Sequence, residues 1–521
     1  MNYVTDTRQR PSWYITTAIP YVNAAPHIGF ALELVQADCL ARFHQAAGYD
    51  VRFQTGSDEN SLKNVVAAQK AGVPTRQLVA DNAQLFVRLG NALNTRADGF
   101  IRTSADARHR LGVEKLWRAA DARGDIYKKS YQGLYCVGCE QFYRPDDLVD
   151  GRCPEHGTEP EEVAEENYFF RLSRYRNTLL DLITRGELAI EPAGRRNEVL
   201  RWLEDGLEDF SISRSSARAH GWGLPVPDDP DQVIYVWFDA LGNYVTALDY
   251  DIEGGLYQRY WTGAERRSHV VGKGITRFHA IYWPAMLLSA GLPLPDRILV
   301  HGYVTVEGDK IGKSTGNAVD PLPVIAAHGA DALRYYLLRH IRTAEDGDFS
   351  NERLAQAYDT ELAGQFGNLA NRVLSLIERY AGGVVPARDD GADPTALSRA
   401  TEALPDIVAG HVDRFALNEA LAAIWDVIGE ANRHVAASEP WSLAKQIAAS
   451  EDGAAAGSLQ RDLDTCLHDL AAALDVIARA CWPFLPEASE KLLGQLGLTS
   501  AADRRPLTGR RVRTGAVLFP R

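Results

Sequence analysis

The chain has 521 residues, of which 45% are hydrophobic, so at ~150 residues per domain it has material for three or four domains with ordinary cores. Its formal net charge of −13 excludes an overall basic coat that would bind nucleic acid non-specifically. Local arginine stripes could still hold an RNA, for example Arg334, Arg339 and Arg342, although the default for such a run is a solvated helix face.

The cellular location follows from what the sequence lacks. No window of 18 apolar residues occurs, and the polar segment Met1 to Pro11 is no signal peptide. The six cysteines are too few for a disulfide scaffold in so long a chain, which fits a reducing compartment. We therefore expect a cytoplasmic protein without a membrane segment.

The first predicted element is a buried strand over the apolar run Trp13 to Ile19. Two prolines interrupt the chain, and apolar residues with helical spacing begin at His27. Because the first amides of a helix have no partner within it and its dipole favours negative charge, a helix start carrying His27 and Gly29 could hold phosphate. A surface histidine at an ordinary helix start is the alternative.

A second strand over residues 49–56 ends in Ser57-Asp58-Glu59-Asn60, and helices are expected over 61–71, 78–93 and 108–122. This alternation of strands and helices predicts an α/β fold with a doubly wound parallel sheet. From about residue 127 the alternation stops, which indicates an insertion.

The sheet is expected to resume with strands over 233–238, 269–272 and 297–301. Residues 351–490 have helical periodicity almost throughout, so an all-α domain should follow. The tail from Leu507 to Arg521 alternates apolar residues and should pack back as a short strand.

The insertion contains the spacing Cys136-x2-Cys139-x13-Cys153-x2-His156. Two close pairs of soft ligands on tight turns can converge on one tetrahedral zinc ion. Since four protein ligands leave no open position, this zinc would be structural. Buried free cysteines are the alternative.

A glycine-flanked loop runs from Gly308 to Ser314 and contains Lys310 and Lys313. It is not a Walker A loop, because only three residues separate its glycines and no long apolar helix follows. Two lysines and a hydroxyl on such a loop suit the phosphates of a nucleotide. A plain surface turn would look the same.

The segment His27-Ile-Gly29 and the loop Lys310-Ile-Gly-Lys313-Ser314 resemble the two signatures of class I aminoacyl-tRNA synthetases. Their placement on either side of a zinc-bearing insertion and ahead of a helical domain is similar to the methionyl-tRNA synthetase family, in its bacterial type with a single zinc knuckle. The segments that also match that family in order are 18–21, 235–240, 278–279, 282–284, 301–303 and 367–372.

The resemblance implies a Rossmann-like sheet split by the zinc-bearing insertion and followed by an anticodon-binding helical bundle. The implied parts are residues 1–122 and 232–318 for the two catalytic halves, 123–231 for the insertion, 319–360 for a stem-contact linker, and 361–521 for the anticodon-binding domain. It also implies a monomer that uses ATP with magnesium, L-methionine and tRNA(Met). Methionine would be activated to methionyl-adenylate and then passed to the tRNA.

By residue matching, His27 would stabilise the α-phosphate of ATP and Lys313 the leaving pyrophosphate, supported by Lys310 and Ser314. Asp58 would bind the ammonium of methionine. The implied ATP-binding positions are His27, Gly29, Phe30, Gly272, Gly274 and Lys313. The implied methionine pocket is Ile19, Tyr21, Trp237, Ala240, Leu241, Tyr244, Phe278, His279 and Tyr282. Such aromatic positions are otherwise more often plain core.

In the helical domain, Asn368 and Arg372 lie four residues apart and therefore on one helix face. The resemblance implies that they and Trp441 hold the anticodon, the tryptophan by stacking on a base. An exposed polar face and a tryptophan in the core are the alternatives.

The chain departs from the family pattern at four places: Phe30 replaces a histidine, Asn60-Ser61 replaces His-Gly, Gly274 replaces an aspartate, and Ile311-Gly312 replaces Met-Ser. These changes suit a specialised or inhibitor-resistant duplicate of the enzyme. Three other readings are a noncatalytic tRNA-binding relative, an enzyme that adenylates an amino acid for a small-molecule pathway, and a plain nucleotidylyltransferase. The zinc insertion and the long helical domain argue against the last.

Overall fold

The computed structural model describes residues 10–136, 141–143, 145–155, 157–306, 308–310 and 318–520. The chain divides into two compact units. The first unit comprises residues 1–37, 48–91 and 96–301, and the second comprises 38–47, 92–95 and 302–521. Of the predicted lysine loop, Lys313 and Ser314 lie outside the described residues.

Six described strands of the first unit form one parallel sheet in the order β3-β2-β1-β12-β13-β7. They are β1 (Ser12–Thr17), β2 (Asp50–Ser57), β3 (Gly99–Arg102), β7 (Ala189–Glu191), β12 (Arg266–Gly272) and β13 (Arg297–His301). The chain goes from β1 to its neighbour β2 on one side and later returns to β12 on the other, so the strand order reverses at β1. This confirms the doubly wound sheet, and in such sheets ligands bind beyond the carboxyl ends of the strands at the reversal.

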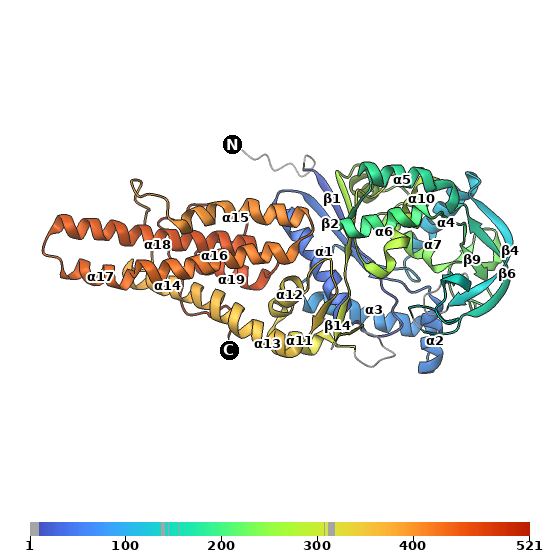
Figure 1. The fold of residues 1–521 in the computed structure, drawn as a ribbon, viewed down its shortest axis with the longest axis horizontal. Helices are drawn as coiled ribbons and strands as arrows, with labels where there is room; N and C mark the ends of the chain where they lie inside the picture. The colour runs from blue at the N-terminus through green and yellow to red at the C-terminus, as the bar shows by residue number, and fades with distance from the viewer. Residues whose placement is uncertain are drawn as a thin grey trace. The chain divides into compact units, whose positions relative to one another are not determined.

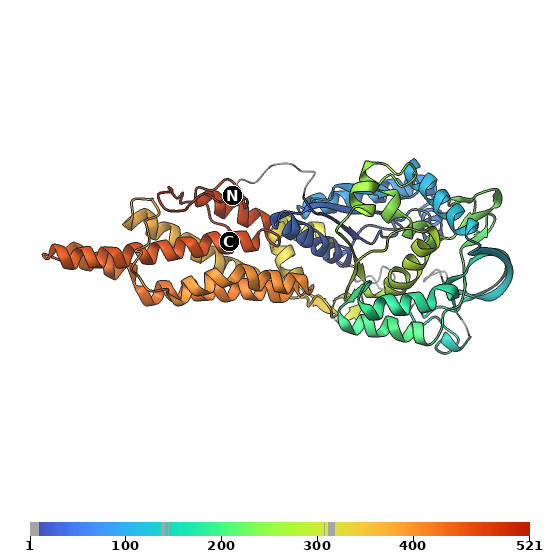
Figure 2. The ribbon, with the colours of Figure 1, turned by 90° about the horizontal axis from the view of Figure 1, so that it is seen from above.

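Helices accompany this sheet where the sequence predicts them. Ser61 caps α2 by accepting a hydrogen bond from the amide of Lys63, and Gly72 ends the helix with φ 69°. Figures 1 and 2 show α5 and α6 side by side. The helices that begin in this unit are α1 (Ile28–Ala46), α2 (Leu62–Ala71), α3 (Thr75–Ala92), α4 (Ala107–Ala122), α5 (Arg176–Arg185), α6 (Ala193–Glu204), α7 (Val236–Leu241), α8 (Asn243–Thr246), α9 (Gly255–Tyr257) and α10 (Trp283–Ala290).

The predicted insertion contains two small antiparallel sheets, with orders β5-β4-β6-β8 and β10-β11-β9. Their strands are β4 (Ile126–Cys136), β5 (Gln141–Tyr143), β6 (Glu161–Phe170), β8 (Phe210–Ser211), β9 (Ser213–Ser215), β10 (Pro225–Val226) and β11 (Asp229–Ile234). The same stretch also supplies β7, which pairs with β13 at the edge of the main sheet.

The prediction of a main-sheet strand over residues 233–238 is wrong. Strand β11 ends at Ile234 and belongs to the sheet β10-β11-β9, and α7 begins at Val236. A short, wholly apolar run fits a buried helix as well as a buried strand, so periodicity could not separate the two.

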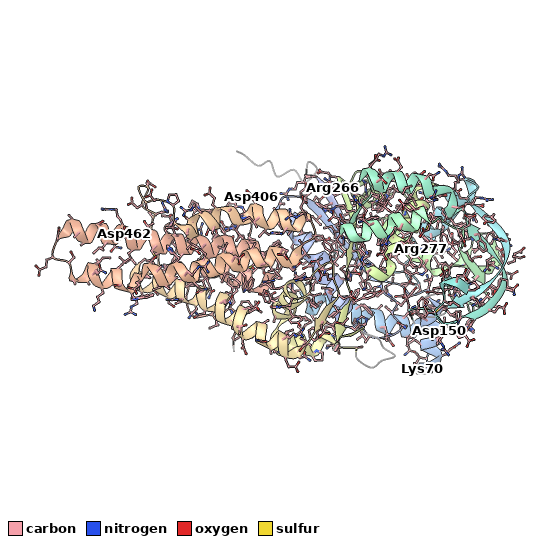
Figure 3. All side chains as sticks on the ribbon, viewed as in Figure 1. Lys70, Asp150, Arg266, Arg277, Asp406 and Asp462 are labelled. Atoms are coloured by element: carbon pink, nitrogen blue, oxygen red, sulfur yellow. The ribbon has the colours of Figure 1, made fainter. Side chains whose placement is uncertain are left out.

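The second unit is mainly helical, as predicted. Its helix α14 buries Leu369, Val373 and Ile377 on one face. Helices α15, α16 and α18 pack together, and the exposed Asp406 on α15 and Asp462 on α18 are labelled in Figure 3. The elements are β14 (Val304–Val306), β15 (Asp309–Lys310), β16 (Gly347–Phe349), α11 (Pro321–His328), α12 (Ala330–Arg339), α13 (Asn351–Ala357), α14 (Asn368–Tyr380), α15 (Ala396–Asp413), α16 (Leu417–Ser438), α17 (Pro440–Ala449), α18 (Gly453–Cys481) and α19 (Pro486–Gln495).

The tail packs back on the second unit through backbone hydrogen bonds of residues 509–513 and the buried side chains of Val512, Leu518 and Phe519, but its described residues form only an antiparallel bridge between Arg511 and Val384 in place of the predicted strand. Arg334 is fully buried and pairs with Asp38 at 2.7 Å, so it is no part of an exposed basic stripe. Among the described residues, no helix is both long and apolar enough to span a membrane.

Candidate active site

Three predicted site residues of the first unit lie at or just beyond the carboxyl ends of neighbouring strands. His27 follows β1 after a short connection, Asp58 directly follows β2, and Gly272 is the last residue of β12. Parallel strands end at the same edge of a sheet, so these positions, far apart in the sequence, share one edge at the reversal of strand order.

His27 is oriented by the first turn of α1. The amide of Gly29 donates a hydrogen bond to Nδ1 of His27 at 3.1 Å. Since Nδ1 accepts, the ring hydrogen of a neutral imidazole is on Nε2, which is then the donor nitrogen of the ring. A Cβ at Gly29 would lie 2.9 Å from Cε1 of His27, so only glycine leaves room for the ring.

Phe30, a predicted ATP-binding position, faces the core. Its ring is buried and meets Phe86 of α3 edge to face, with the ring centroids 4.9 Å apart. The structure therefore gives Phe30 a packing role, and its side chain has no donor for phosphate.

Glu33 on α1 lies beside the predicted ATP-binding position Gly272, and the sequence analysis did not single it out. Its Oε1 accepts from the amide of Ala18 at 2.9 Å, and its Oε2 lies 2.9 Å from Nε2 of His301 at the end of β13. A Cβ at Gly272 would be 3.5 Å from Cε1 of His301. The signal was a glutamate in a buried apolar helix, because a buried charge needs partners.

Gly274 lies in the 3-10 turn Lys273–Ile275 and is exposed. The turn directly follows Gly272, which keeps Gly274 near the same sheet edge. Its backbone is not among the glycines with positive φ, so a side chain at this position meets no backbone strain.

Three predicted methionine-pocket residues form one aromatic set. The rings of Trp237 and Phe278 stack with centroids 3.6 Å apart and planes 4° from parallel. Phe278 meets Tyr282 edge to face at 5.1 Å. Trp237 comes from α7, and the other two come from the π-helical turn Phe278–Tyr282. A cavity of about 530 Å³ adjoins Phe278 and Tyr282, and Arg277, labelled in Figure 3, lies on its wall.

His279 and Tyr244 form a buried polar pair beside this aromatic set. Nδ1 of His279 donates to the carbonyl of Ile275 at 2.9 Å, so its Nε2 accepts from the hydroxyl of Tyr244 at 2.6 Å. Burial lowers the pKa of His279 to about 4 and raises that of Tyr244, so both groups are neutral at physiological pH. Ala240 and Leu241, on the neighbouring helix α7, are also buried.

Asp58 is buried at the end of β2 and pairs with Tyr21 in a parallel bridge. Its amide donates to the carbonyl of Pro20 at 2.9 Å, and its own carbonyl accepts from Nδ2 of Asn64 at 3.1 Å. The ammonium of Lys63 lies 4.4 Å from the Tyr21 ring centroid. The backbone that carries the Asp58 carboxylate is thus fixed from both sides, and Ile19 lies half-buried on the same β1–α1 connection.

Two of the four predicted zinc ligands, Cys139 and His156, lie outside the described residues. The other two, Cys136 and Cys153, are buried in one small cluster. Sγ of Cys136 is 3.8 Å from Oγ1 of Thr158, whose carbonyl accepts from the amide of Cys153 at 2.9 Å. The described part of the chain brings no group of three or more possible metal ligands together, but two cysteines buried in one small cluster suit half of a tetrahedral site.

In the second unit, the structure brings two predicted anticodon residues together. The guanidinium carbon of Arg372 lies 5.4 Å from the ring centroid of Trp441. Trp441 is 40% exposed, which contradicts the alternative of a tryptophan in the core. Asn368, one turn before Arg372 on α14, is exposed as well.

Comparison with known proteins agrees with this geometry. The chain matches the model of the family described as class I tRNA synthetases (M) over residues 13–162 and 145–374. The methionine–tRNA ligase of Mycobacterium leprae is 43% identical over 98% of this chain and 93% of the relative. The chain belongs to the methionyl-tRNA synthetase family.

Other members of the family are similar over the same extent. The methionine–tRNA ligase of Mycobacterium bovis is 42% identical over 98% of this chain and 96% of the relative. The solved structure of Mycobacterium tuberculosis methionyl-tRNA synthetase in complex with methionyl-adenylate has a TM-score of 0.91 and 41% identity, and covers 98% of this chain and 100% of that one. The predicted family, fold class and enzyme class, an aminoacyl-tRNA synthetase, are therefore confirmed.

Proposed function

We propose that the protein is a methionine–tRNA ligase. It condenses L-methionine with ATP to methionyl-adenylate, releasing pyrophosphate, and transfers the methionyl group to tRNA(Met), releasing AMP. The observations that carry the proposal are the buried carboxylate of Asp58 at the end of β2 and the aromatic set built on the stacked rings of Trp237 and Phe278, of which Phe278 lies in the turn shortly after β12.

These two features suit both ends of methionine. The Asp58 carboxylate binds the ammonium group, and the thioether packs against the edges of Trp237, Phe278 and Tyr282, at ~0.3–1.5 kcal/mol per sulfur–aromatic contact. His279 stays neutral at the pocket because burial holds its pKa at about 4, so it presents no charge to the apolar side chain. Polar or charged amino acids would lose their hydration there without gaining partners.

The ATP end needs positioning and charge neutralisation, with no covalent enzyme intermediate. Nε2 of His27 donates to the α-phosphate, and Gly29 and Gly272 leave room for the nucleotide. Lys313 stabilises the departing pyrophosphate, with Lys310 and Ser314 on the same loop. ATP enters as its magnesium complex, and the ion neutralises part of the phosphate charge.

ATP–pyrophosphate exchange over all the proteinogenic amino acids, followed by charging of initiator and elongator tRNA(Met), tests this proposal. We expect exchange with methionine far above every other amino acid and charging of both tRNAs. Exchange without charging would instead favour an adenylating enzyme of a small-molecule pathway. Intact tRNA binding without exchange would favour a noncatalytic relative.

We also propose one structural zinc ion per chain, held by Cys136, Cys139, Cys153 and His156. The burial of Cys136 and Cys153 in one small cluster supports this site. Metal analysis of the purified protein should find one zinc per chain, and Cys153→Ser should lose it. Cys466→Ser, which replaces a buried thiol in the second unit, should keep the zinc.

Asn368, Arg372 and Trp441 bind the methionine anticodon in this proposal, and the protein acts as a monomer in the cytoplasm. The exposed stack of Arg372 on Trp441 supports the anticodon role, because an exposed aromatic ring can stack on an unpaired base. Sedimentation of the purified protein measures the oligomeric state.

A further inference from the structure

A buried chain of hydrogen bonds crosses the first unit beside the amino-acid site. Nδ2 of Asn60 donates to Oδ2 of Asp239 at 2.6 Å. The other carboxylate oxygen of Asp239 accepts from Nε2 of His109, whose Nδ1 lies 2.8 Å from Oγ1 of Thr246. Asp239, His109 and Thr246 have no exposed surface.

The Asn60–Asp239 bond links two segments of the chain that each carry a proposed methionine-binding residue. Asn60 follows Asp58, the proposed ammonium ligand, by two residues. Asp239 lies on α7 between Trp237 and Ala240, which belong to the side-chain wall. One short bond therefore joins the segment of Asp58 to the segment of Trp237 across 179 residues of sequence.

Asp239 itself has little freedom to move. Its second partner, His109, lies on α4, and a Cβ at Gly112 of α4 would be only 2.5 Å from Cγ2 of Thr246 on α8. The close approach of α4 and α8 fixes His109 and Thr246, and Asp239 on α7 is bonded to this fixed pair through His109. Because a buried carboxylate needs a donor for each oxygen, Asn60 is held against this fixed point.

We propose that Asn60 is a positioning residue that sets the distance between Asp58 and the α7 wall, and through that distance the affinity for methionine. This rests on the proposed methionine-binding roles of Asp58 and Trp237.

The test replaces Asn60 by aspartate and measures exchange kinetics. In Asn60→Asp two carboxyl groups would face each other at about the original 2.6 Å, so they stay hydrogen-bonded only while they share a proton; once both are ionised at high pH they repel each other and the bond is lost. At pH 8 the KM for methionine should rise at least about tenfold, equivalent to about 1.4 kcal/mol, with kcat and the KM for ATP changing less. The increase should shrink as the pH is lowered toward 6, because the shared proton restores the bond.

The matched control exchanges the two groups. In the double variant Asn60→Asp/Asp239→Asn, one amide again faces one carboxylate, and the new amide oxygen at position 239 still accepts from His109. Its methionine KM should return to within about threefold of the wild-type value, a coupling that independent sites do not show. A merely structural role would give neither this rescue nor the pH dependence.

If Asn60→Asp does not fold, Asn60→Ser, which is too short to reach Asp239, should raise the methionine KM in the same assay. Two outcomes would overturn the positioning role while leaving the proposed function intact. One is an unchanged methionine KM in Asn60→Asp or in Asn60→Ser. The other is a change in the methionine KM of the double variant that equals the product of the changes in Asn60→Asp and Asp239→Asn, each measured alone. A wild-type protein that exchanges with no amino acid would overturn both.

Discussion

The amide nitrogen of Gly29 lies 3.1 Å from Nδ1 of His27 and fixes the tautomer of that ring. The imidazole thus has its hydrogen on Nε2 before any nucleotide binds. A donor set in advance needs no rearrangement when charge develops on the phosphate, which is how electrostatic stabilisation lowers a barrier most effectively. Any residue except proline would supply this amide, but only glycine also leaves the space that the ring occupies in this orientation.

Gly29→Ala should disable His27 without removing it. The new Cβ would sit 2.9 Å from Cε1 and 3.1 Å from Nδ1, so the ring must turn away. Loss of one preorganised donor typically lowers kcat about a hundred- to thousandfold, and we expect a fall of this order in ATP–pyrophosphate exchange. The methionine KM should change little. Gly29→Ala and His27→Ala remove the same donor. The double variant should therefore catalyse ATP–pyrophosphate exchange no more slowly than His27→Ala alone. A decrease in rate equal to the product of the two single effects would contradict this prediction.

Gly274→Asp should improve the use of ATP. The position is exposed, its backbone tolerates a side chain, and it lies in the turn that directly follows Gly272. One added hydrogen bond to the nucleotide is worth about 0.5–1.5 kcal/mol, so the KM for ATP should fall roughly two- to tenfold with the methionine KM unchanged. Gly274→Ala adds bulk without an acceptor and should behave like the wild type. An equal gain in both variants would show that the carboxylate is not responsible.

The sequence was sufficient for the parts of the site that follow directly from a strand end. The strand before His27 has a continuous apolar run and the strand before Asp58 alternates apolar and polar residues, and both end in clear breaks, so each residue could be placed after a strand end in advance. Strand β7 has three residues, too few to produce a pattern, and its pairing with β13 is set only by tertiary contact. For residues 233–238 the apolar run was real, but it spans the end of β11 and the start of α7.

Polar partners across the core were out of reach for a different reason. The Glu33 carboxylate bonds both to the amide of Ala18 and to the ring of His301, and Asn60 bonds to Asp239. These partners are so far apart in the sequence that no periodic pattern connects them. The sequence singles out Asn60 as an unusual residue. Its hydrogen-bond partner Asp239 becomes evident only in the structure, which brings the two segments together. Pairing of buried polar groups depends on geometry at the scale of one hydrogen bond, which composition and spacing do not specify.

Stability should fall between pH 6.5 and pH 4 because of His279. Its pKa is lowered by burial from the ordinary 6.5 to about 4, so in this window the unfolded chain binds a proton that the folded protein does not. The folded state therefore keeps its full stability above pH 6.5 and loses about 3 kcal/mol as the pH falls toward 4. Denaturant unfolding of the wild type and His279→Gln at several pH values measures this. The variant should have the shallower slope, and parallel slopes would rule His279 out as the cause.

Arg372→Ala should weaken tRNA charging without affecting adenylate formation. The guanidinium stacks 5.4 Å from the Trp441 ring centroid, so its removal takes away both an edge-reading group and the support of an exposed stacking platform. Base–aromatic stacking is worth about 1–3 kcal/mol, and we expect the KM for tRNA(Met) to rise at least about tenfold while ATP–pyrophosphate exchange stays at the wild-type rate. Arg372→Lys should restore little, since a lysine lacks the planar fork. Arg399→Ala, at an exposed arginine on α15, is the matched control and should charge normally.

If Arg372 reads the anticodon, its removal should also narrow the difference in charging between tRNA(Met) and a transcript with an altered anticodon; an undiminished difference would assign Arg372 to backbone contact instead.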